Sequence, residues 1–342
     1  MKSLAIKYRP TDWDDVVEQD SIKTILLNQL ETETFKHAYL FCGGAGTGKT
    51  TCARIFANKI NNGMGNPIEM DAASNNSVDD VRNIIQQSKT KSLDSEFKIF
   101  IIDECHALSN SAWQAMLKII EEPPAKSIFI FCTTDPQKIP KTIISRVQRY
   151  DFQRISQDGI IDRLHRILQF EGFGLDSTVE DESLEYIAKL ADGGMRDAIT
   201  LLDKCLSYST DLTLENVVNA LGLVDYDVMR KLTDAVMFNR QSEIISIIEN
   251  IHASGKDLKQ FVKSYMSFIL DVTKYGIGCD WKYIQIPNTQ EISDWLDNVV
   301  DYTVCFDLMD TLVKLNSDIK YSSTPKSDIV ATLLLMTVGG TE

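Results

Sequence analysis

The sequence lacks any pair of cysteines spaced as CxxC, although its 342 residues include seven cysteines. Several of these cysteines stand inside apolar runs, where a free cysteine behaves as a small buried hydrophobe. The four histidines are scattered, and none has a second ligand at a metal-binding spacing. We therefore expect neither a structural zinc site nor redox-active cysteines, and His106, which follows two acidic residues, is expected to be their structural neighbour.

The sequence also lacks a long apolar run. No window reaches the roughly 18 apolar residues of a membrane-spanning helix, and the N-terminus MKSLAIKYRP does not resemble a signal peptide. Positive charge is in deficit, because 35 Lys and Arg residues oppose 49 Asp and Glu residues and leave a formal net charge of -14. We expect a cytoplasmic protein without membrane contact that does not coat nucleic acid with its whole surface, while a local basic path to DNA stays open.

The length suggests two or three domains. Short apolar runs alternate with helical patterns in about the first 150 residues, and strands that alternate with helices predict a parallel sheet covered on both faces. The expected strands are 38–43, 67–73, 97–103, 127–134 and 147–152. After about residue 155 only helical patterns follow. We therefore predict an α/β domain over 1–155, a small helical domain over 156–215 and a second, all-helical domain over 216–342.

A glycine-rich segment, GGAGTGKT at 43–50, stands between an expected strand and an expected helix. Glycines let backbone N–H groups face phosphate oxygens, Lys49 reaches the β- and γ-phosphates, and the Thr50 hydroxyl offers a ligand to magnesium. The pattern predicts a P-loop that binds ATP or another nucleoside triphosphate with Mg²⁺. The residues expected to contact the nucleotide here are Gly43, Gly44, Ala45, Gly46, Thr47, Gly48, Lys49, Thr50 and Thr51.

Two carboxylates, Asp103 and Glu104, end the apolar strand pattern KIFIIDE. At the end of a parallel strand, Asp103 can hold magnesium together with Thr50, and Glu104 can orient and polarise the attacking water. The next expected strand ends in TTD at 133–135, which places hydroxyl groups at the same edge of the sheet. Taken alone, that last pattern is an ordinary signal for a turn after a strand.

Six stretches, in this order, resemble a known family: KYRPTDWDDVVEQ, HAYLFCGGAGTGKTT, DAASNNSVDDVR, IIDECHALSNSAWQAMLKIIEEPP, TTDPQKIPKTIISR and DGGMRDAITLLDK. In these stretches, over about residues 1–205, the chain resembles the clamp-loader ATPase subunits of the bacterial DNA polymerase III gamma/tau family. The helical remainder is similar to the family's collar domain more loosely. The resemblance implies an AAA+ P-loop domain, a helical lid and a helical collar through which subunits oligomerise.

The resemblance also implies roles for single residues. It makes Thr134 the sensor of the γ-phosphate and Arg196, in GGMRDA, a second sensor that reaches the nucleotide from the lid. Arg146, in ISR, resembles an arginine finger that completes the ATP site of a neighbouring subunit, where a planar cation offsets charge on the transferred phosphoryl group. Together with Lys49 and Glu104, these three residues are the expected catalytic set. Adenine-side contacts are expected from Tyr8, Arg9, Pro10, Val16 and Val17, which by themselves would also suit a hydrophobic N-terminal anchor.

Partners follow from the same resemblance: a sliding clamp, primer–template DNA, and other loader subunits or copies of this chain in a ring or spiral inside a bacterial cell. DNA contacts in the family come from helix starts that face the inside of the ring. Here the segment after DAAS offers Asn75, Asn76, Ser77 and Arg82. Backbone N–H groups and scattered cations can track phosphates without reading bases, although a solvated helix face would carry the same residues.

The sequence departs from the family pattern at three places. Only NKINNGMGNP, at 58–67, stands where the family usually has a four-cysteine zinc module, and Val147 stands where it usually has a cysteine. The chain also stops near residue 342, without the long extension of the tau form. No zinc is expected, and a form this compact is compatible, from size alone, with a phage-encoded protein.

Two other functions stay open. The segment DECH could mark a helicase of the DExH type, but such a helicase needs a second α/β motor domain, and the pattern after residue 215 is helical. A non-hydrolysing scaffold would use ATP only as a structural ligand, yet it should have lost at least one of Lys49, Asp103, Glu104 and Arg146. We expect instead an ATPase, stimulated by clamp and DNA, that opens a sliding clamp and places it on primer–template DNA.

Overall fold

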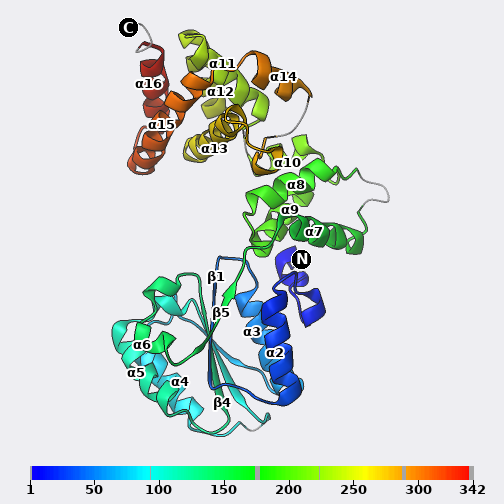
Figure 1. Ribbon diagram of the computed structural model, residues 1–342, viewed down its shortest axis with the longest axis vertical. Coiled ribbons are helices and arrows are strands. Elements are labelled where there is room, and N and C mark those ends of the chain that lie inside the picture. The colour runs from blue at the N-terminus through cyan, green and yellow to red at the C-terminus, as the bar shows by residue number, and fades with distance from the viewer. Residues whose placement is uncertain (1, 93, 174–177, 223, 287–289, 339–342) are drawn as a thin grey trace. The chain divides into compact units, whose positions relative to one another are not determined.

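The chain divides into two compact units, Met1–Thr213 and Leu214–Glu342, in a computed structural model (Figure 1). The structure describes residues 2–92, 94–173, 178–222, 224–286 and 290–338. The first unit contains both the predicted α/β domain and the predicted lid, so the three-domain division over 1–155, 156–215 and 216–342 stays a prediction.

A five-stranded, all-parallel sheet forms the centre of the first unit, with the strand order β2-β3-β4-β1-β5. The strands are β1 (Ala38–Gly43), β2 (Ile68–Asp71), β3 (Lys98–Asp103), β4 (Ser127–Thr133) and β5 (Gln148–Phe152). The apolar runs predicted all five, and the α/β prediction is confirmed. The register pairs Gly43 with Phe152, Cys42 with Thr133, and Asp71 with Asp103. The carboxyl ends of the strands therefore line up along one edge.

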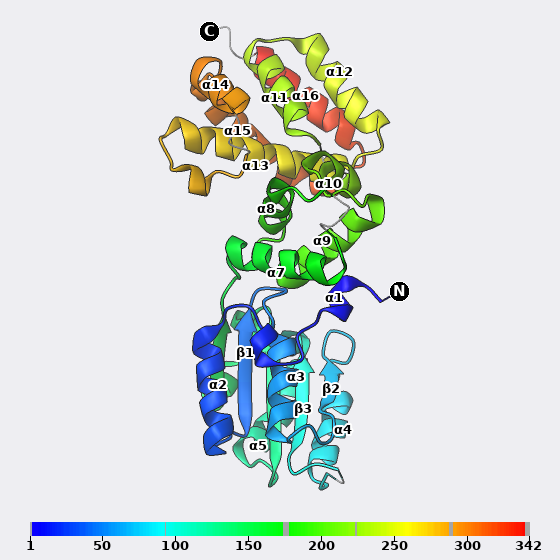
Figure 2. The ribbon, with the colours of Figure 1, turned by 90° about the vertical axis from the view of Figure 1, so that its right-hand side faces the viewer.

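Helices cover both faces of this sheet because side chains alternate along each strand. Tyr39 and Phe41 point into a buried cluster with α2 and α3, whereas Leu40 and Cys42 point into a second cluster with α4 and α5. Figures 1 and 2 show α2 and α3 on one face and α4 and α5 on the other. The helices of this domain are α1 (Leu4–Lys7), α2 (Asp20–Thr32), α3 (Lys49–Ile60), α4 (Val78–Ser88), α5 (Asn110–Glu121) and α6 (Lys141–Ile144), with 3₁₀ turns η1 (Trp13–Asp15), η2 (Cys105–Ala107) and η3 (Pro136–Lys138).

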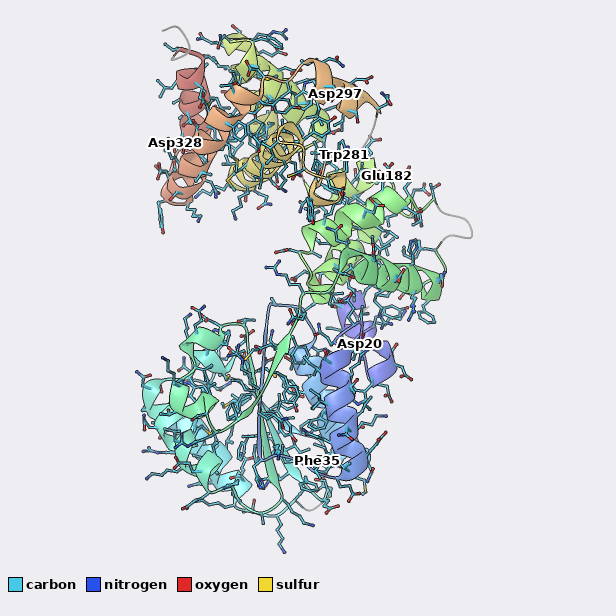
Figure 3. The ribbon with its side chains drawn as sticks, viewed as in Figure 1. Asp20, Phe35, Glu182, Trp281, Asp297 and Asp328 are labelled. Carbon is cyan, nitrogen blue, oxygen red and sulfur yellow. The ribbon has the colours of Figure 1, made fainter. Side chains whose placement is uncertain are left out.

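Aromatic side chains close the end of the sheet opposite to this edge. Phe35, labelled in Figure 3, meets Phe56 of α3 and Phe97 edge to face, with ring centroids 6.3 and 5.4 Å away. Edge-to-face packing is a favourable geometry for aromatic pairs. These contacts anchor α3, and with it the glycine-rich segment before α3, to the sheet.

The lid consists of three helices, α7 (Gln157–Phe170), α8 (Asp181–Leu190) and α9 (Met195–Tyr208), and an isolated bridge between Val179 and Leu212. Apolar residues at helical spacing form its interior: Ile160, Leu164 and Ile167 of α7 are fully buried. The Ser156 side chain accepts a hydrogen bond from the Gly159 N–H and caps α7.

Glu18 and Gln19 fix the linker that joins sheet and lid. The Gln19 amide both donates to the Gln153 carbonyl at 2.8 Å and accepts from the Gln153 N–H at 3.1 Å. The Glu18 carboxylate accepts from the backbone N–H of Ser156 at 3.1 Å, and from its hydroxyl. Both residues have left-handed backbones, with φ of 54° and 59°. Such a conformation costs roughly 1–2 kcal/mol at a non-glycine residue, so these contacts must offset real strain.

Helices and 3₁₀ turns, joined by short loops, make up the described residues of the second unit. Its helices are α10 (Leu214–Leu221), α11 (Tyr226–Met237), α12 (Gln241–Ala253), α13 (Leu258–Gly276), α14 (Gln290–Asn298), α15 (Tyr302–Asp318) and α16 (Pro325–Val338), with 3₁₀ turns η4 (Trp281–Tyr283) and η5 (Ile319–Tyr321). Phe261, Tyr265 and Phe268 form a stacked row along α13, and the buried Tyr265 hydroxyl lies 3.1 Å from Thr233 Oγ1. This row is the centre of the helical core.

The periphery of this unit carries both polar and apolar features. Tyr275 packs on Trp281 and donates to the Asp297 carboxylate at 2.6 Å; Trp281 and Asp297 are labelled in Figure 3.

Helices α15 and α16 expose apolar side chains: Phe306, Val313, Leu335 and Val338 are 49–71% exposed. Across the described part of the chain, no helix has both the length and the apolar character needed to cross a membrane.

Candidate functional site

The glycine-rich segment 43–50 leaves β1 and enters α3 as a tight loop. Gly43, Gly46 and Gly48 all have positive φ, at 151°, 70° and 100°. A Cβ on Gly43 would lie 2.5 Å from the Phe152 carbonyl oxygen of the neighbouring strand, so no larger residue fits there. Glycine supplies both the backbone conformation and the space that the loop requires.

Lys49 is the first residue of α3 and is only 6% exposed. Its Nζ donates to the carbonyl oxygens of Gly43 at 2.9 Å and Gly44 at 2.6 Å. Burial lowers the pKa of Lys49, and the nearby carboxylate of Glu104 opposes that shift. The ammonium group is thus held at the mouth of the loop, where phosphate oxygens would meet it.

Thr50, in the first turn of α3, and Asp103, at the end of β3, lie within hydrogen-bond distance of each other. Thr50 Oγ1 donates to Asp103 Oδ2 at 2.8 Å, and the other carboxylate oxygen accepts from the Glu104 N–H at 3.0 Å. A hydroxyl and a carboxylate oxygen side by side are the hard donors that Mg²⁺ prefers, and magnesium usually keeps several water ligands besides. The residues present therefore fit magnesium, which Thr50 and Asp103 would hold.

Glu104 follows Asp103 with a left-handed backbone, φ 44° and ψ 43°. Its Oε2 accepts from Thr134 Oγ1 at 2.8 Å and from the Thr134 N–H at 3.3 Å. His106 Nδ1 lies 3.2 Å from the same oxygen and 3.2 Å from Thr133 Oγ1. The two strand ends are joined through one carboxylate oxygen, and His106 contacts that oxygen directly.

The lid closes on the loop through glycine backbone. The Met195 N–H, in the first turn of α9, donates to the Gly46 carbonyl at 3.1 Å. A Cβ on Gly46 would lie 2.9 Å from the Gly194 Cα. Arg196, the next residue of α9, is exposed, and no hydrogen bond or ion pair of its guanidinium involves a residue that the structure describes. The predicted second sensor, Arg196, therefore lies beside the loop, and its guanidinium is bound to no residue that the structure describes.

Gly46→Ala is expected to push the lid away from the loop, because the added Cβ meets the Gly194 Cα in addition to the strain of a positive φ. We expect the affinity for an ATP analogue to fall about tenfold. Separately, backbone strain at the positive φ should lower the free energy of unfolding by roughly 1–2 kcal/mol. Titration with a labelled analogue and thermal unfolding measure the two effects. Gly63→Ala is the matched control, since Gly63 has φ 79° and nothing within 4 Å of its Cβ position. Equal losses of affinity in both variants would contradict a role for the contact.

The predicted adenine-side residues lie on a segment tied to both the sheet and the lid. Val16 is buried in the cluster that contains Cys52 and Ala53 of α3, and Val17 Cγ1 lies 3.1 Å from the Cβ position of Gly159 in α7. Buried Arg163 of α7 donates to the Tyr8 carbonyl and to Asp15, both at 3.2 Å. Tyr8 stacks on Phe170, Pro10 is half-buried and Arg9 is exposed. Their role as base contacts stays a prediction.

Arg146 lies away from this site. It stands just before β5, at the amino end of the sheet, and its Nε pairs with Glu121 Oε1 at 2.8 Å. No contact joins it to the loop or to Glu104 among the described residues.

The predicted DNA residues, Asn75, Asn76, Ser77 and Arg82, are all exposed at the start of α4. Ser77 and Asp80 form a reciprocal cap, and Arg82 pairs with Asp79 at 2.8 Å. Two acidic residues in this first turn oppose a phosphate electrostatically, so Arg82 would have to leave Asp79 to reach one. The DNA role of this segment stays a prediction.

Burial raises the pKa of the Cys42 thiol, beside the loop, to about 11 and that of Cys52 to about 12. Both thiols are protonated at neutral pH. Within the described residues, no three His, Cys, Asp or Glu side chains gather as a multi-ligand metal centre.

Sequence reasoning missed three contributors: Glu18 and Gln19 at the linker, and Glu121 beside Arg146. All three occur inside stretches that carry recognised motifs. Their partners come from distant parts of the chain, so spacing along the sequence carries no signal for them. His106, by contrast, is expected from the sequence beside the acidic pair, and it contacts Glu104.

Two family models match the chain. Residues 66–156 match the model described as "DNA polymerase III, delta subunit", and residues 159–211 match "DNA polymerase III clamp loader subunit, ATPase lid domain". Among curated relatives, the DNA polymerase III subunit tau of Bacillus subtilis is 36% identical over 93% of this chain and 60% of its own length. Subunit gamma of Buchnera aphidicola is 32% identical over 82% of this chain and 83% of its own length.

Solved structures agree on the fold. RuvB of Thermotoga maritima, described as a Holliday junction branch migration motor, superposes with a TM-score of 0.53 at 18% identity, over 68% of this chain and 80% of that one. The chain spans 60% of the Bacillus tau subunit and 48% of the Salmonella typhimurium one. The sheet order, the lid and the match to the Buchnera subunit over most of its length lead to one assignment: the chain belongs to the DNA polymerase III gamma/tau family of clamp-loader subunits and has the AAA+ fold.

Proposed function

We propose that this chain is a Mg²⁺-dependent ATPase that works inside a clamp-loader ring, opens a sliding clamp and places it on primer–template DNA in a bacterial cytoplasm. One observation carries the proposal. Lys49, the Thr50–Asp103 pair and the Glu104–Thr134 pair meet at the carboxyl edge of one parallel sheet. A phosphate-binding cation, two magnesium ligands, a carboxylate base and a hydroxyl sensor are the parts that phosphoryl transfer to water needs.

Each side chain has a defined task in this proposal. Lys49 donates to the β- and γ-phosphate oxygens in place of the loop carbonyls. Glu104 accepts a hydrogen bond from the attacking water and orients it, and Thr134 holds that carboxylate and detects the γ-phosphate. Magnesium, when bound, offsets phosphate charge and aligns the triphosphate. Arg196 reaches the phosphates from the lid.

The arginine finger of this site must come from another subunit. Arg146 of the same chain precedes β5, whose first and last residues are roughly 13 Å apart, while the P-loop follows the far end of the paired strand β1. That separation exceeds the reach of an arginine side chain along the strand. We therefore assign Arg146 to the ATP site of a neighbouring subunit, where it offsets charge on the transferred phosphoryl group.

Assembly and DNA binding draw on other surfaces. The exposed apolar side chains of α15 and α16 suit contact with neighbouring subunits, because such a contact would remove them from water. Asn75, Asn76, Ser77 and Arg82 suit phosphate tracking once Asp79 releases Arg82. ATP binding stabilises the state that grips clamp and DNA, and hydrolysis releases it, so energy enters as a difference in affinity between two states.

Neither alternative is favoured. A DExH helicase requires a second α/β motor, and Leu214–Val338 is helical in its described parts. A scaffold that does not hydrolyse ATP would not need the hydrogen bonds that hold Glu104 beside Asp103 and Thr134.

Phosphate release is the deciding measurement. The assembled loader containing this chain should release phosphate slowly alone and faster with clamp and primed DNA, and the mass of the complex with clamp and an ATP analogue should include the clamp. Turnover that clamp and DNA leave unchanged would contradict the loading function, and absent turnover would contradict the ATPase itself.

A further inference from the structure

The guanidinium of Arg146 is held on two of its three nitrogens. Nη1 donates to the Thr142 carbonyl at 2.8 Å and to Ser145 Oγ at 3.1 Å, both on or beside α6. Nε pairs with Glu121 Oε1 at 2.8 Å, at the end of α5. No hydrogen bond from Nη2 reaches a residue that the structure describes. Nε and Nη1 are therefore held by the chain, and Nη2 is left for a partner.

The planar shape of guanidinium makes this arrangement directional. Contacts on Nε and Nη1 together determine the plane of the group and the direction of Nη2, whereas contacts on Nη1 alone would leave it free to pivot. A group ordered in advance loses less entropy when it meets a phosphate.

Stability does not explain the pair of Glu121 and Arg146. Their side chains are 46% and 39% exposed, and exposed ion pairs contribute little to the free energy of unfolding. The charges around Glu121 do explain why a carboxylate stands at this position. Both residues line a hollow of about 440 Å³ whose other charged or titratable groups are Lys36 and His37. Glu121 is the one carboxylate among three basic side chains and draws Arg146 toward α5.

We infer that Glu121 is a positioning residue for Arg146, which aims the guanidinium at the ATP site of the neighbouring subunit. This inference rests on the proposed function, because it takes Arg146 as a finger that acts in trans. Glu121 itself touches neither nucleotide nor water. Its effect is exerted on the neighbour's hydrolysis step and not on this chain's own ATP site.

The test compares Glu121→Gln with Glu122→Gln in the assembled loader, with MgATP, clamp and primed DNA. Both variants remove one negative charge from adjacent exposed residues, but only Glu121 pairs with Arg146. We expect kcat for phosphate release to fall roughly 3- to 10-fold in Glu121→Gln, with KM for ATP and the unfolding temperature unchanged, and to stay unchanged in Glu122→Gln. A double variant with Arg146→Ala should lose no more than Arg146→Ala alone.

Several outcomes overturn the inference. Equal kcat in the two glutamine variants, or additive losses in the double variant, would leave Glu121 without a role in aiming the finger. A higher kcat in Glu121→Gln would mean that Glu121 withholds Arg146. If Arg146→Ala itself leaves turnover intact, the finger assignment fails and the inference fails with it, so the two failures are distinguishable.

Discussion

Glu104→Gln is expected to lower phosphate release by at least about 100-fold, which corresponds to roughly 2.7 kcal/mol of lost transition-state stabilisation. A glutamine amide keeps an oxygen that can accept from Thr134, so the strand ends stay joined, but it cannot polarise water as a carboxylate does. Single-turnover hydrolysis measures the chemical step, and titration with a labelled ATP analogue should give an affinity within about threefold of the original.

Glu33→Gln is the matched control for this variant. Glu33, like Glu104, is a glutamate with a left-handed backbone, φ 49°, but it is exposed and follows the end of α2. The control separates loss of the carboxylate at the site from loss of a charge at a strained position. Unchanged turnover in Glu104→Gln would sink the ATPase proposal, because no other described carboxylate lies beside Asp103 and Thr134 together.

Arg146→Ala is expected to lower hydrolysis about 1,000-fold at the neighbouring site while leaving nucleotide binding at its own site intact, since arginine fingers supply factors of roughly 10³ to 10⁵. Complementation measures the direction of action in assemblies that hold at least two copies of this chain. An Arg146→Ala subunit retains an intact Glu104, and a Glu104→Gln subunit retains an intact finger. Mixed assemblies should therefore recover turnover that neither variant has alone.

Arg149→Ala is the control, because Arg149 is a neighbouring arginine with 40% side-chain exposure that pairs locally with Asp151. It should leave turnover near the original value. Mixtures that recover nothing, although each variant assembles and is inactive alone, would show that Arg146 acts within its own chain.

The local parts of the fold and site could be predicted from the sequence, and the long-range parts could not. The strand runs, the P-loop and the Asp103–Glu104 pair are written in consecutive residues, because period and glycine placement act over short distances. The contact of Gly46 with Gly194 joins residues far apart in the chain, and the sequence around either glycine does not predict the other as its partner. The same holds for Arg146 and Glu121, and for Gln19 and Gln153.

The DNA prediction illustrates a different limit. A helix start with Asn75, Asn76 and Ser77 has the composition of a phosphate contact, but the structure commits Ser77 to Asp80 and Arg82 to Asp79. Composition identifies which groups are present and does not show which of them already have partners. That is why the magnesium residues, which are adjacent in space and mutually bonded, are better supported than the DNA residues.

The linker between sheet and lid leaves little room for gradual motion. Gln19 and Glu18 bond Gln153 and Ser156 from one side, while Ile155 and Arg154 donate to the Gly193 and Asp192 carbonyls at 3.1 and 3.0 Å on the other. A small rotation of the lid would lengthen bonds on both sides before new ones could form. The lid is therefore expected to change between two orientations in a single step that crosses an energy barrier. The rate of nucleotide exchange would then follow the rate of that step.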